Sequence, residues 1–247
     1  MWLLSGDLAE GAEVAATAID APGAENVPVW RARALYGDGL LAFRAGDMDR
    51  SRARNEEALR VARASGDLRG ECDGLTGLAR VALRDGRYEN AVALAREARE
   101  RARSARDAAA ESAPLHLEAA GVRMLQDYAA ARKLYTESLE LGRREGIAGR
   151  VAMEQHNLGW VELHLGDVDA AEQRFRERDA ASGVDAYGDA WSDLNWAAVA
   201  VARQNWDEAR RRFERGRAGL DKLAMVLDPD DQFEFDWLRG RIEESRC

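Results

Sequence analysis

The stretch His156–Ala171, HNLGWVELHLGDVDAA, contains the pattern that decides the fold. It combines an apolar helix face, a Gly-Asp break, and a second helix that has a small residue where the two helices should touch. The same layout recurs in both directions along the chain, every 40 residues except for a last interval of 38. Aligned on the break between paired helices, the copies are Gly6-Asp7, Gly46-Asp47, Gly86-Arg87, Gln126-Asp127, Gly166-Asp167 and Gln204-Asn205.

Residue size recurs around each break as well. Seven positions before the break the residue is small in Gly39, Ala79, Ala119, Gly159 and Ala197. Five positions after it the residue is again small, in Gly11, Ser51, Ala91, Ala131, Ala171 and Ala209. Two positions after it the side chain is large, in Leu8, Met48, Tyr88, Tyr128, Val168 and Trp206. Small residues let paired backbones approach and the large one fills the space beside the turn. Almost nothing alternates with period two, so we predict an all-α fold.

The corners between successive pairs carry a second signal. Gly66 and Gly146 follow helical runs where a left-handed C-cap is favoured, and Gly183 takes this role slightly early. Around Arg106-Asp107 there is no glycine. We therefore expect either a tighter corner there or a longer helix.

The pattern predicts a single solenoid over residues 1–247. Residues 1–20 supply the tail of one helix, a turn and a second helix, so the chain is either a piece of a longer protein or has an atypical start. Complete repeats are predicted at 29–66, 67–106, 107–146, 147–183 and 184–227. Asp228 and Pro229 have the residue types of an N-cap and a first helical position, which predicts a capping helix over 228–247 at the edge of the last hairpin.

Composition limits the functional class. The net charge is −9 and the pI is near 5.1, which is not the electrostatic footprint of a nucleic-acid binder. Cys72 and Cys247 make a poor disulfide framework, which favours a reducing cytoplasm. No apolar run approaches the roughly 18 residues of a membrane span, and the N-terminus does not resemble a signal peptide. We expect a cytoplasmic protein that contacts neither nucleic acid nor membrane directly.

The motifs resemble the tetratricopeptide repeat. The residues that carry the resemblance are Asn157-Leu158-Gly159 with Gly166-Asp167, Ala171 and Phe175; Leu78-Ala79 with Gly86, Tyr88, Ala91 and Ala98; and Trp196-Ala197 with Trp206, Ala209 and Phe213. The resemblance covers essentially the whole chain. It departs from the common pattern because the repeat is 40 residues instead of about 34 and because the usual proline near the end of the unit is absent. Longer helices would accommodate the difference, as in long-repeat members attached to bacterial signalling ATPases, transcription activators and peptide-sensing regulators.

This resemblance implies a right-handed superhelix whose concave wall is lined by the first helix of each hairpin. The ligand-binding residues that we predict on that wall are Arg80, Arg84, His116, Arg123, His156, Asn157, Trp160, His164, Trp191 and Asn195. Five arginines against one aspartate line the first three repeats, namely Arg33, Arg44, Arg80, Arg84 and Arg123 against Asp73. We expect arginines to hold carboxylates. We expect the amides of Asn157 and Asn195 to hold a peptide backbone, because an amide offers both a donor and an acceptor.

Each of these residues also has a purely structural interpretation. The arginines could form a solvated face, Trp160 could fill space between first helices, and the two asparagines could bond between helices. A metal site is disfavoured because His156 and His164 are separated by about 12 Å along a helix axis at 1.5 Å per residue, whereas zinc needs its nitrogens about 2 Å away. There is no phosphate loop and no nucleophile elbow. We therefore predict no metal, no cofactor and no enzymatic activity.

The sequence thus favours a module that binds a protein or peptide segment in its groove, as the sensor or interaction part of a larger bacterial signalling or transcription-regulatory protein. The alternative is a self-assembling scaffold, such as a homodimer, that pairs through the open edges of the solenoid. A chaperone adaptor with a two-carboxylate clamp matches poorly. Such a clamp uses lysines on first helices, whereas Lys133 and Lys222 fall on predicted second helices.

Overall fold

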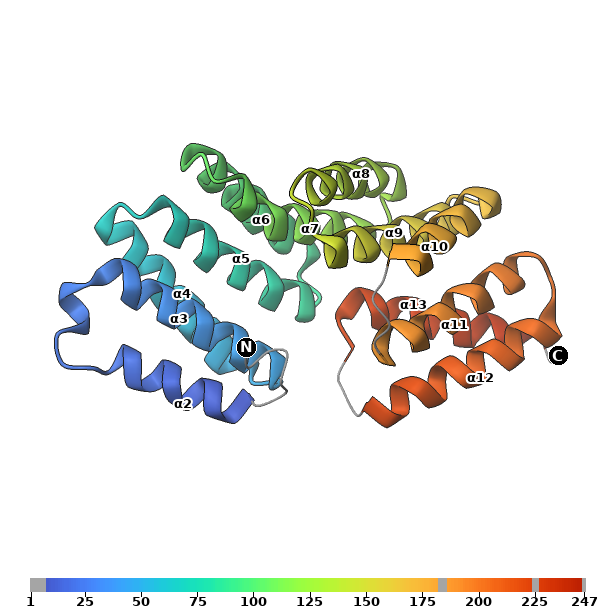
Figure 1. Ribbon diagram of the computed structural model, residues 1–247, viewed down its shortest axis with the longest axis horizontal. Helices are drawn as coiled ribbons and strands as arrows, with labels where there is room; N and C mark the ends of the chain where they lie inside the picture. Colours follow the sequence, from blue (N-terminus) through green and yellow to red (C-terminus); the bar gives the residue numbers. More distant parts are fainter. Residues whose placement is uncertain (1–7, 182–185, 224–226, 246–247) are drawn as a thin grey trace. The chain divides into compact units, whose positions relative to one another are not determined.

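The computed structural model describes residues 8–181, 186–223 and 227–245 of the chain. Within these residues all regular secondary structure is helical, and successive helices form antiparallel hairpins (Figure 1). The first helices of the hairpins are α3 (Pro28–Arg44), α5 (Leu68–Arg84), α7 (Ala108–Met124), α9 (Ala148–His164) and α11 (Ala186–Ala202). The second helices are α2 (Leu8–Ile19), α4 (Met48–Ser65), α6 (Tyr88–Ser104), α8 (Tyr128–Arg144), α10 (Val168–Ala181) and α12 (Trp206–Leu223). A short 3-10 helix, η1 (Ala24–Asn26), precedes α3, and α13 (Pro229–Glu244) follows the last hairpin.

The repeating small residues bring paired helices into close contact. Gly159 on α9 faces the ring of Phe175 on α10, and a Cβ at residue 159 would overlap that ring. Gly39 on α3 faces the side chain of Asn55 on α4 in the same way. Each first helix has 17 residues. The long helices account for the 40-residue repeat.

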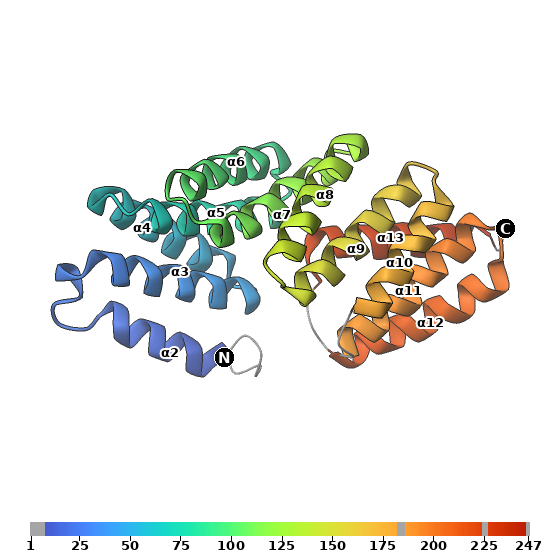
Figure 2. The same ribbon diagram turned by 45° about the horizontal axis from the view of Figure 1, so that its top comes forward.

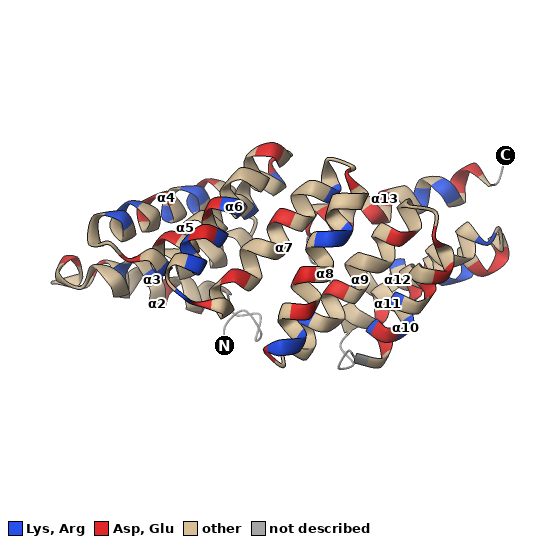
Figure 3. Cartoon of the chain, turned by 90° about the horizontal axis from the view of Figure 1, so that it is seen from above, with Lys and Arg blue, Asp and Glu red and all other residues tan. Residues whose placement is uncertain are grey.

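Aspartates begin several of the second helices. The Asp47 carboxylate accepts a hydrogen bond from the backbone N–H of Arg50 at 3.0 Å, and Asp127 accepts one from Ala130 at 3.0 Å. These bonds satisfy backbone donors that the first turn of a helix leaves unpaired. Charged residues of both signs are spread along second helices such as α4 and α6 (Figure 3).

A left-handed residue ends the helices at the corners. Glycine supplies it at residues 46, 66, 86, 146 and 166. Arg106 adopts φ 55° although it is not glycine, and α6 ends at Ser104 with α7 beginning at Ala108. The expectation of a tighter corner or a longer helix there was wrong, because Arg106 itself takes the left-handed conformation. The predicted break at Gly6-Asp7 and the corner at Gly183 lie outside the described residues.

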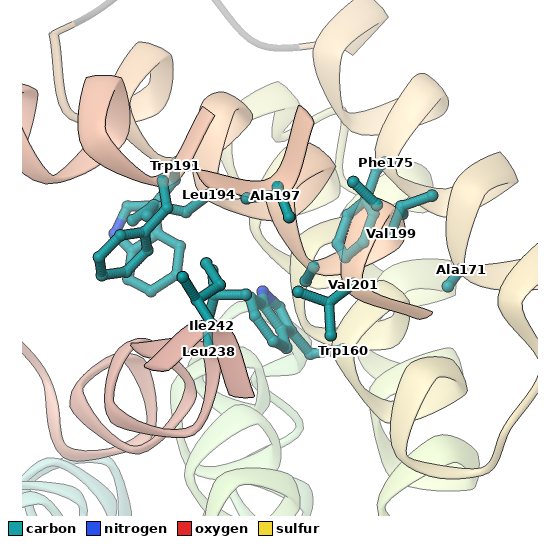
Figure 4. Close-up of a cluster of buried hydrophobic side chains, with 14 of the residues drawn as sticks. Trp160, Ala171, Phe175, Trp191, Leu194, Ala197, Val199, Val201, Leu238 and Ile242 are labelled. Carbon is teal, nitrogen blue, oxygen red and sulfur yellow. The ribbon is translucent and has the colours of Figure 1, made fainter. Parts of the chain in front are cut away.

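The chain divides into two compact units, residues 1–121 and 122–247, with the division inside α7. In unit 1, Leu35 and Ala58 belong to a core cluster between α3 and α4, and Leu75 and Ala98 to a second between α5 and α6. In unit 2 the core centres on Trp160, and Leu238 and Ile242 of α13 lie beside it (Figure 4). The prediction that residues 1–247 form a single domain stays a prediction.

The last helix, α13, lies alongside α11 and α12 (Figures 1 and 2). Its first helical residue is Pro229, at the predicted position, although the Asp228 side chain makes no capping hydrogen bond. The Phe235 ring lies 5.3 Å from the Phe213 ring of α12, so α13 packs against the final hairpin. Other faces of α13 contact first helices, and these contacts form the candidate site.

Candidate binding site on the first helices of unit 2

The first helices of unit 2 form a surface that α13 covers. We call this surface the unit 2 wall and define it by Arg123 at the end of α7, His156, Trp160 and His164 on α9, and Trp191 on α11. The indole ring of Trp237 on α13 lies 5.9 Å from the Trp160 ring and 5.4 Å from the His164 ring. The wall is therefore occupied by a segment of the same chain that does not belong to the repeats.

Arg123 is the most deeply buried cation of this wall. Its Nη2 lies 2.8 Å from the Asp230 carboxylate and its Nη1 lies 3.8 Å from Glu234, both on α13. Nη1 also donates a hydrogen bond to Asn157 Oδ1 at 3.1 Å. Burial disfavours the charged guanidinium, but the neighbouring Tyr135, Asp230 and Glu234 outweigh burial and raise the pKa of Arg123. Arg123 therefore stays charged and holds the acidic side of α13.

Two histidines on α9 extend this pairing. His156 Nε2 lies 3.4 Å from Asp231, and His164 Nε2 lies 2.8 Å from Glu234. The Tyr187 hydroxyl on α11 also donates a hydrogen bond to Asp231. Burial tends to raise the pKa of Asp231, but the hydrogen bond and charge of His156, the Tyr187 hydroxyl and the charge of Arg123 lower it below its ordinary value. Asp231 is thus held as a carboxylate.

The aromatic part of the wall is closely packed. Trp160 has no exposed surface, and its Nε1 donates a hydrogen bond to Asn195 Oδ1 at 2.9 Å. Its ring makes edge contacts with Trp191, Phe175 and Trp237, with centroid separations of 6.4, 6.3 and 5.9 Å. Figure 4 shows Trp191 and Phe175 near Trp160. Trp160 and Asn195 therefore serve packing between first helices.

These contacts correct one expectation from the sequence. The predicted residues of unit 2 were expected to line an open wall, and instead they are covered by α13 or packed between helices. The structure does bring seven of them together, namely Arg123, His156, Asn157, Trp160, His164, Trp191 and Asn195. Their role in binding a ligand stays a prediction.

The remaining three predicted residues lie in unit 1. Arg80 Nη1 on α5 donates a hydrogen bond to the Tyr36 hydroxyl on α3 at 3.0 Å. The Arg84 guanidinium lies over the Phe43 ring, 4.5 Å from its centroid. Both arginines and His116 on α7 are partly exposed. Aromatic side chains therefore position Arg80 and Arg84 on the first helices of unit 1.

Sequence reasoning missed the acidic side of α13 as a component of the site. Residues 228–247 were predicted only as a capping helix at the edge of the last hairpin. A usable signal was present, because three carboxylates stand within five residues, at positions 230, 231 and 234. Their number equals that of the basic side chains on the wall, which are Arg123, His156 and His164.

The described part of the chain has neither a metal-binding group nor a membrane-spanning helix. No group of three or more histidine, cysteine, aspartate or glutamate side chains there could hold a metal ion. Among the same residues, no helix combines the length and the apolar character that crossing a bilayer requires.

Comparison with known proteins identifies the repeat. A family model described as tetratricopeptide repeat matches residues 30–104. The match places tetratricopeptide repeats within residues 30–104. Members of this class serve in general as non-catalytic scaffolds for protein contacts. No curated protein sequence matches the chain.

Solved structures of the same fold match most of the chain. BtubC (BKLC) from P. vanneervenii superposes with a TM-score of 0.67 at 19% identity, over 90% of this chain and 91% of that one. A Rap protein complexed with Competence and Sporulation Factor gives 0.65 at 14% identity, over 86% of this chain and 57% of that one. The repeats of a putative kinesin light chain from Podosopora anserina give 0.61 at 17% identity, over 81% and 99%. The predicted all-α, tetratricopeptide-like solenoid is confirmed.

Proposed function

We propose that this tetratricopeptide-repeat chain is a non-catalytic module that binds a segment of a partner protein on its first helices. One observation carries the proposal: the unit 2 wall holds a helix from outside the repeats through Arg123, His156 and His164. A surface that holds one acidic segment in this way has the chemistry to recognise acidic segments in general.

The first helices of unit 1 provide a second recognition surface. Arg80 and Arg84 are partly exposed and are positioned by Tyr36 and Phe43. A guanidinium that is already oriented loses less conformational freedom when it pairs with a carboxylate. We propose that these arginines take carboxylates of the partner.

We place the module in a larger cytoplasmic regulator of bacterial type. The Rap structure supports this context, since that protein was solved with Competence and Sporulation Factor bound. The present chain spans 57% of the length of that Rap chain. The regulatory context therefore remains a proposal about the whole protein.

The test uses the full chain as bait in an extract of the organism that encodes it. Arg80→Ala removes a proposed recognition residue, and Arg60→Ala removes a 70% exposed arginine from the second helix α4 as the matched control. We expect a partner that is retained by the wild-type chain and by Arg60→Ala but is lost with Arg80→Ala. Equal retention by both variants would contradict the assignment.

Self-assembly is the second candidate function, and one observation favours it. In unit 1, Trp30 is 66% exposed and Val27 is 48% exposed, and both line a cavity of about 220 Å³ formed by α2, α3 and the segment that connects them. Large exposed apolar side chains of this kind often mark contact surfaces. Sedimentation at several concentrations tests the idea: an assembly that dissociates with Trp30→Ala supports it, and a wild-type chain that stays monomeric excludes it.

A further inference from the structure

We propose that the unit 2 wall is a binding surface for an acidic segment that carries a tryptophan, and that α13 is its exchangeable occupant. A partner segment of the same chemistry would take the place of α13. This inference rests on the proposed function and names both the partner class and the regulation of that site.

The contacts of α13 define the partner. Asp230 faces Arg123, Asp231 faces His156, and Glu234 faces both Arg123 and His164. Trp237 lies one turn further along and contacts the rings of Trp160 and His164. The wall thus recognises two or three carboxylates within five residues, followed by an indole. A partner that presents this pattern would meet the same guanidinium, the same two imidazoles and the same aromatic surface.

At the contact between α13 and the unit 2 wall, some buried polar atoms have no hydrogen-bond partner. Among the described residues, Arg123 Nε and His156 Nδ1 on the wall and Glu234 Oε1 on α13 are buried without a hydrogen-bond partner. A buried polar atom without a partner costs free energy, and a buried ion pair adds little net stability unless its remaining donors and acceptors are satisfied. The contact between α13 and the wall is therefore weaker than its number of charges indicates. A better-matched segment can compete with it.

The topology allows the exchange. α13 comes after the last hairpin in the chain, so it separates no two repeats. The hairpins α9–α10 and α11–α12 have contacts that do not involve α13, such as Phe175 against Gly159 and Leu194 against Gly216. Departure would expose Trp160 and Trp191. The open wall therefore favours immediate occupation by another segment.

The experiment uses the full chain and a fluorescent peptide with the sequence of residues 229–244. Asp230→Asn with Glu234→Gln weakens the docking of the chain's own α13 and leaves the wall intact. The matched control, Glu243→Gln with Glu244→Gln, neutralises two exposed carboxylates on the same helix. We expect the peptide to bind the first variant at least tenfold more tightly than the wild-type chain, and to bind the control as it binds the wild type. Equal binding to all three chains, or to none, would overturn the proposal.

Hydrogen exchange of the unaltered chain supplies a measurement that requires no variant to fold. We expect the amides of α13 to exchange faster than those of α9 and α11, because α13 opens by itself. Exchange of α13 at the same rate as α9 would overturn the proposal.

A concentration-dependent dimer that is lost only in Asp230→Asn with Glu234→Gln would overturn the choice of a partner protein, since a second copy would then be the occupant. The Arg80→Ala capture assay concerns unit 1, so it can succeed where these tests fail.

Discussion

Single side chains decide how closely the helices of a hairpin approach. Gly159 has no Cβ and so lets the Phe175 ring lie directly against α9, whereas Gly149 on the same helix has open space around it. The small residues that recur at fixed positions around each break predicted the close contact at Gly159. It could not predict which side chain fills the contact, because Phe175 reaches residue 159 only through the geometry of the folded hairpin.

Gly159→Ala should destabilise the chain by about 1–3 kcal/mol through overpacking against Phe175. Gly149→Ala is the matched control on the same helix. It should be neutral or stabilising by up to about 1 kcal/mol, because alanine favours a helix more than glycine does. Urea denaturation of both variants measures the difference. A Gly159→Ala chain as stable as Gly149→Ala would show that the backbones do not approach as described.

Cys72 should be unreactive in the folded chain. Burial, together with the charge of Asp73, raises the pKa of the Cys72 thiol to about 11. Below about pH 9 the thiol is neutral in both the folded and the unfolded chain. As the pH rises from about 9 to 11, the thiol ionises in the unfolded chain before it ionises in the folded chain, so the free energy of unfolding falls. In a Cys247→Ser chain we expect thiol reagents at pH 7 to label Cys72 only as fast as the protein opens. Rapid labelling under native conditions would contradict the buried position.

At the scale of elements, the sequence predicted helix starts better than corners or docking. Pro229 begins its helix as expected. The corner at Arg106 was missed because any residue can take a positive φ at a modest cost, and composition does not reveal it. The docking of α13 on the wall was missed because carboxylates of one helix pair with cations far away in the sequence. Such long-range pairing leaves no local pattern.

Among the described residues, three corners hold a non-glycine residue in the left-handed conformation, at Arg106, Gln126 and Gln204. Gln126 has φ 64° and Gln204 has φ 59°. Gln126→Gly and Gln204→Gly should each stabilise the chain by about 1 kcal/mol, because glycine avoids the left-handed penalty. Gln173→Gly, at an exposed position inside α10, is the control with the opposite sign and should cost about 1 kcal/mol. If Gln126→Gly were as destabilising as Gln173→Gly, the corner geometry would be wrong.

At the scale of the whole molecule, unit 2 completes its core with a helix that is outside the repeats. Arg123, His156 and Tyr187 surround the carboxylate of Asp231, and each comes from a different first helix. The sequence indicated which residues share the wall, but it could not show that the chain itself occupies that wall. Occupation depends on the folded path of α13.

The docking of α13 should depend on acid pH through Asp231. Because the pKa of Asp231 is lowered in the folded chain, its contribution is fully present above about pH 4, its ordinary value in unfolded chains. The contribution is lost as the pH falls below that value through the folded pKa. The difference in unfolding free energy between the wild-type and Asp231→Asn chains should shrink as the pH falls below about 4. A difference that does not shrink in that range would contradict the lowered pKa of Asp231.

The most direct test of the central claim fixes α13 on the wall. In a Cys247→Ser chain, His164→Cys and Glu234→Cys place two thiols on α9 and α13 where the native side chains meet at 2.8 Å, and a short bismaleimide bridges them while Cys72 remains protected. We predict that the bridge abolishes binding of the fluorescent peptide of residues 229–244, whereas the same chain before bridging binds it. If the bridged and unbridged chains bind the peptide equally, α13 does not occupy a binding surface.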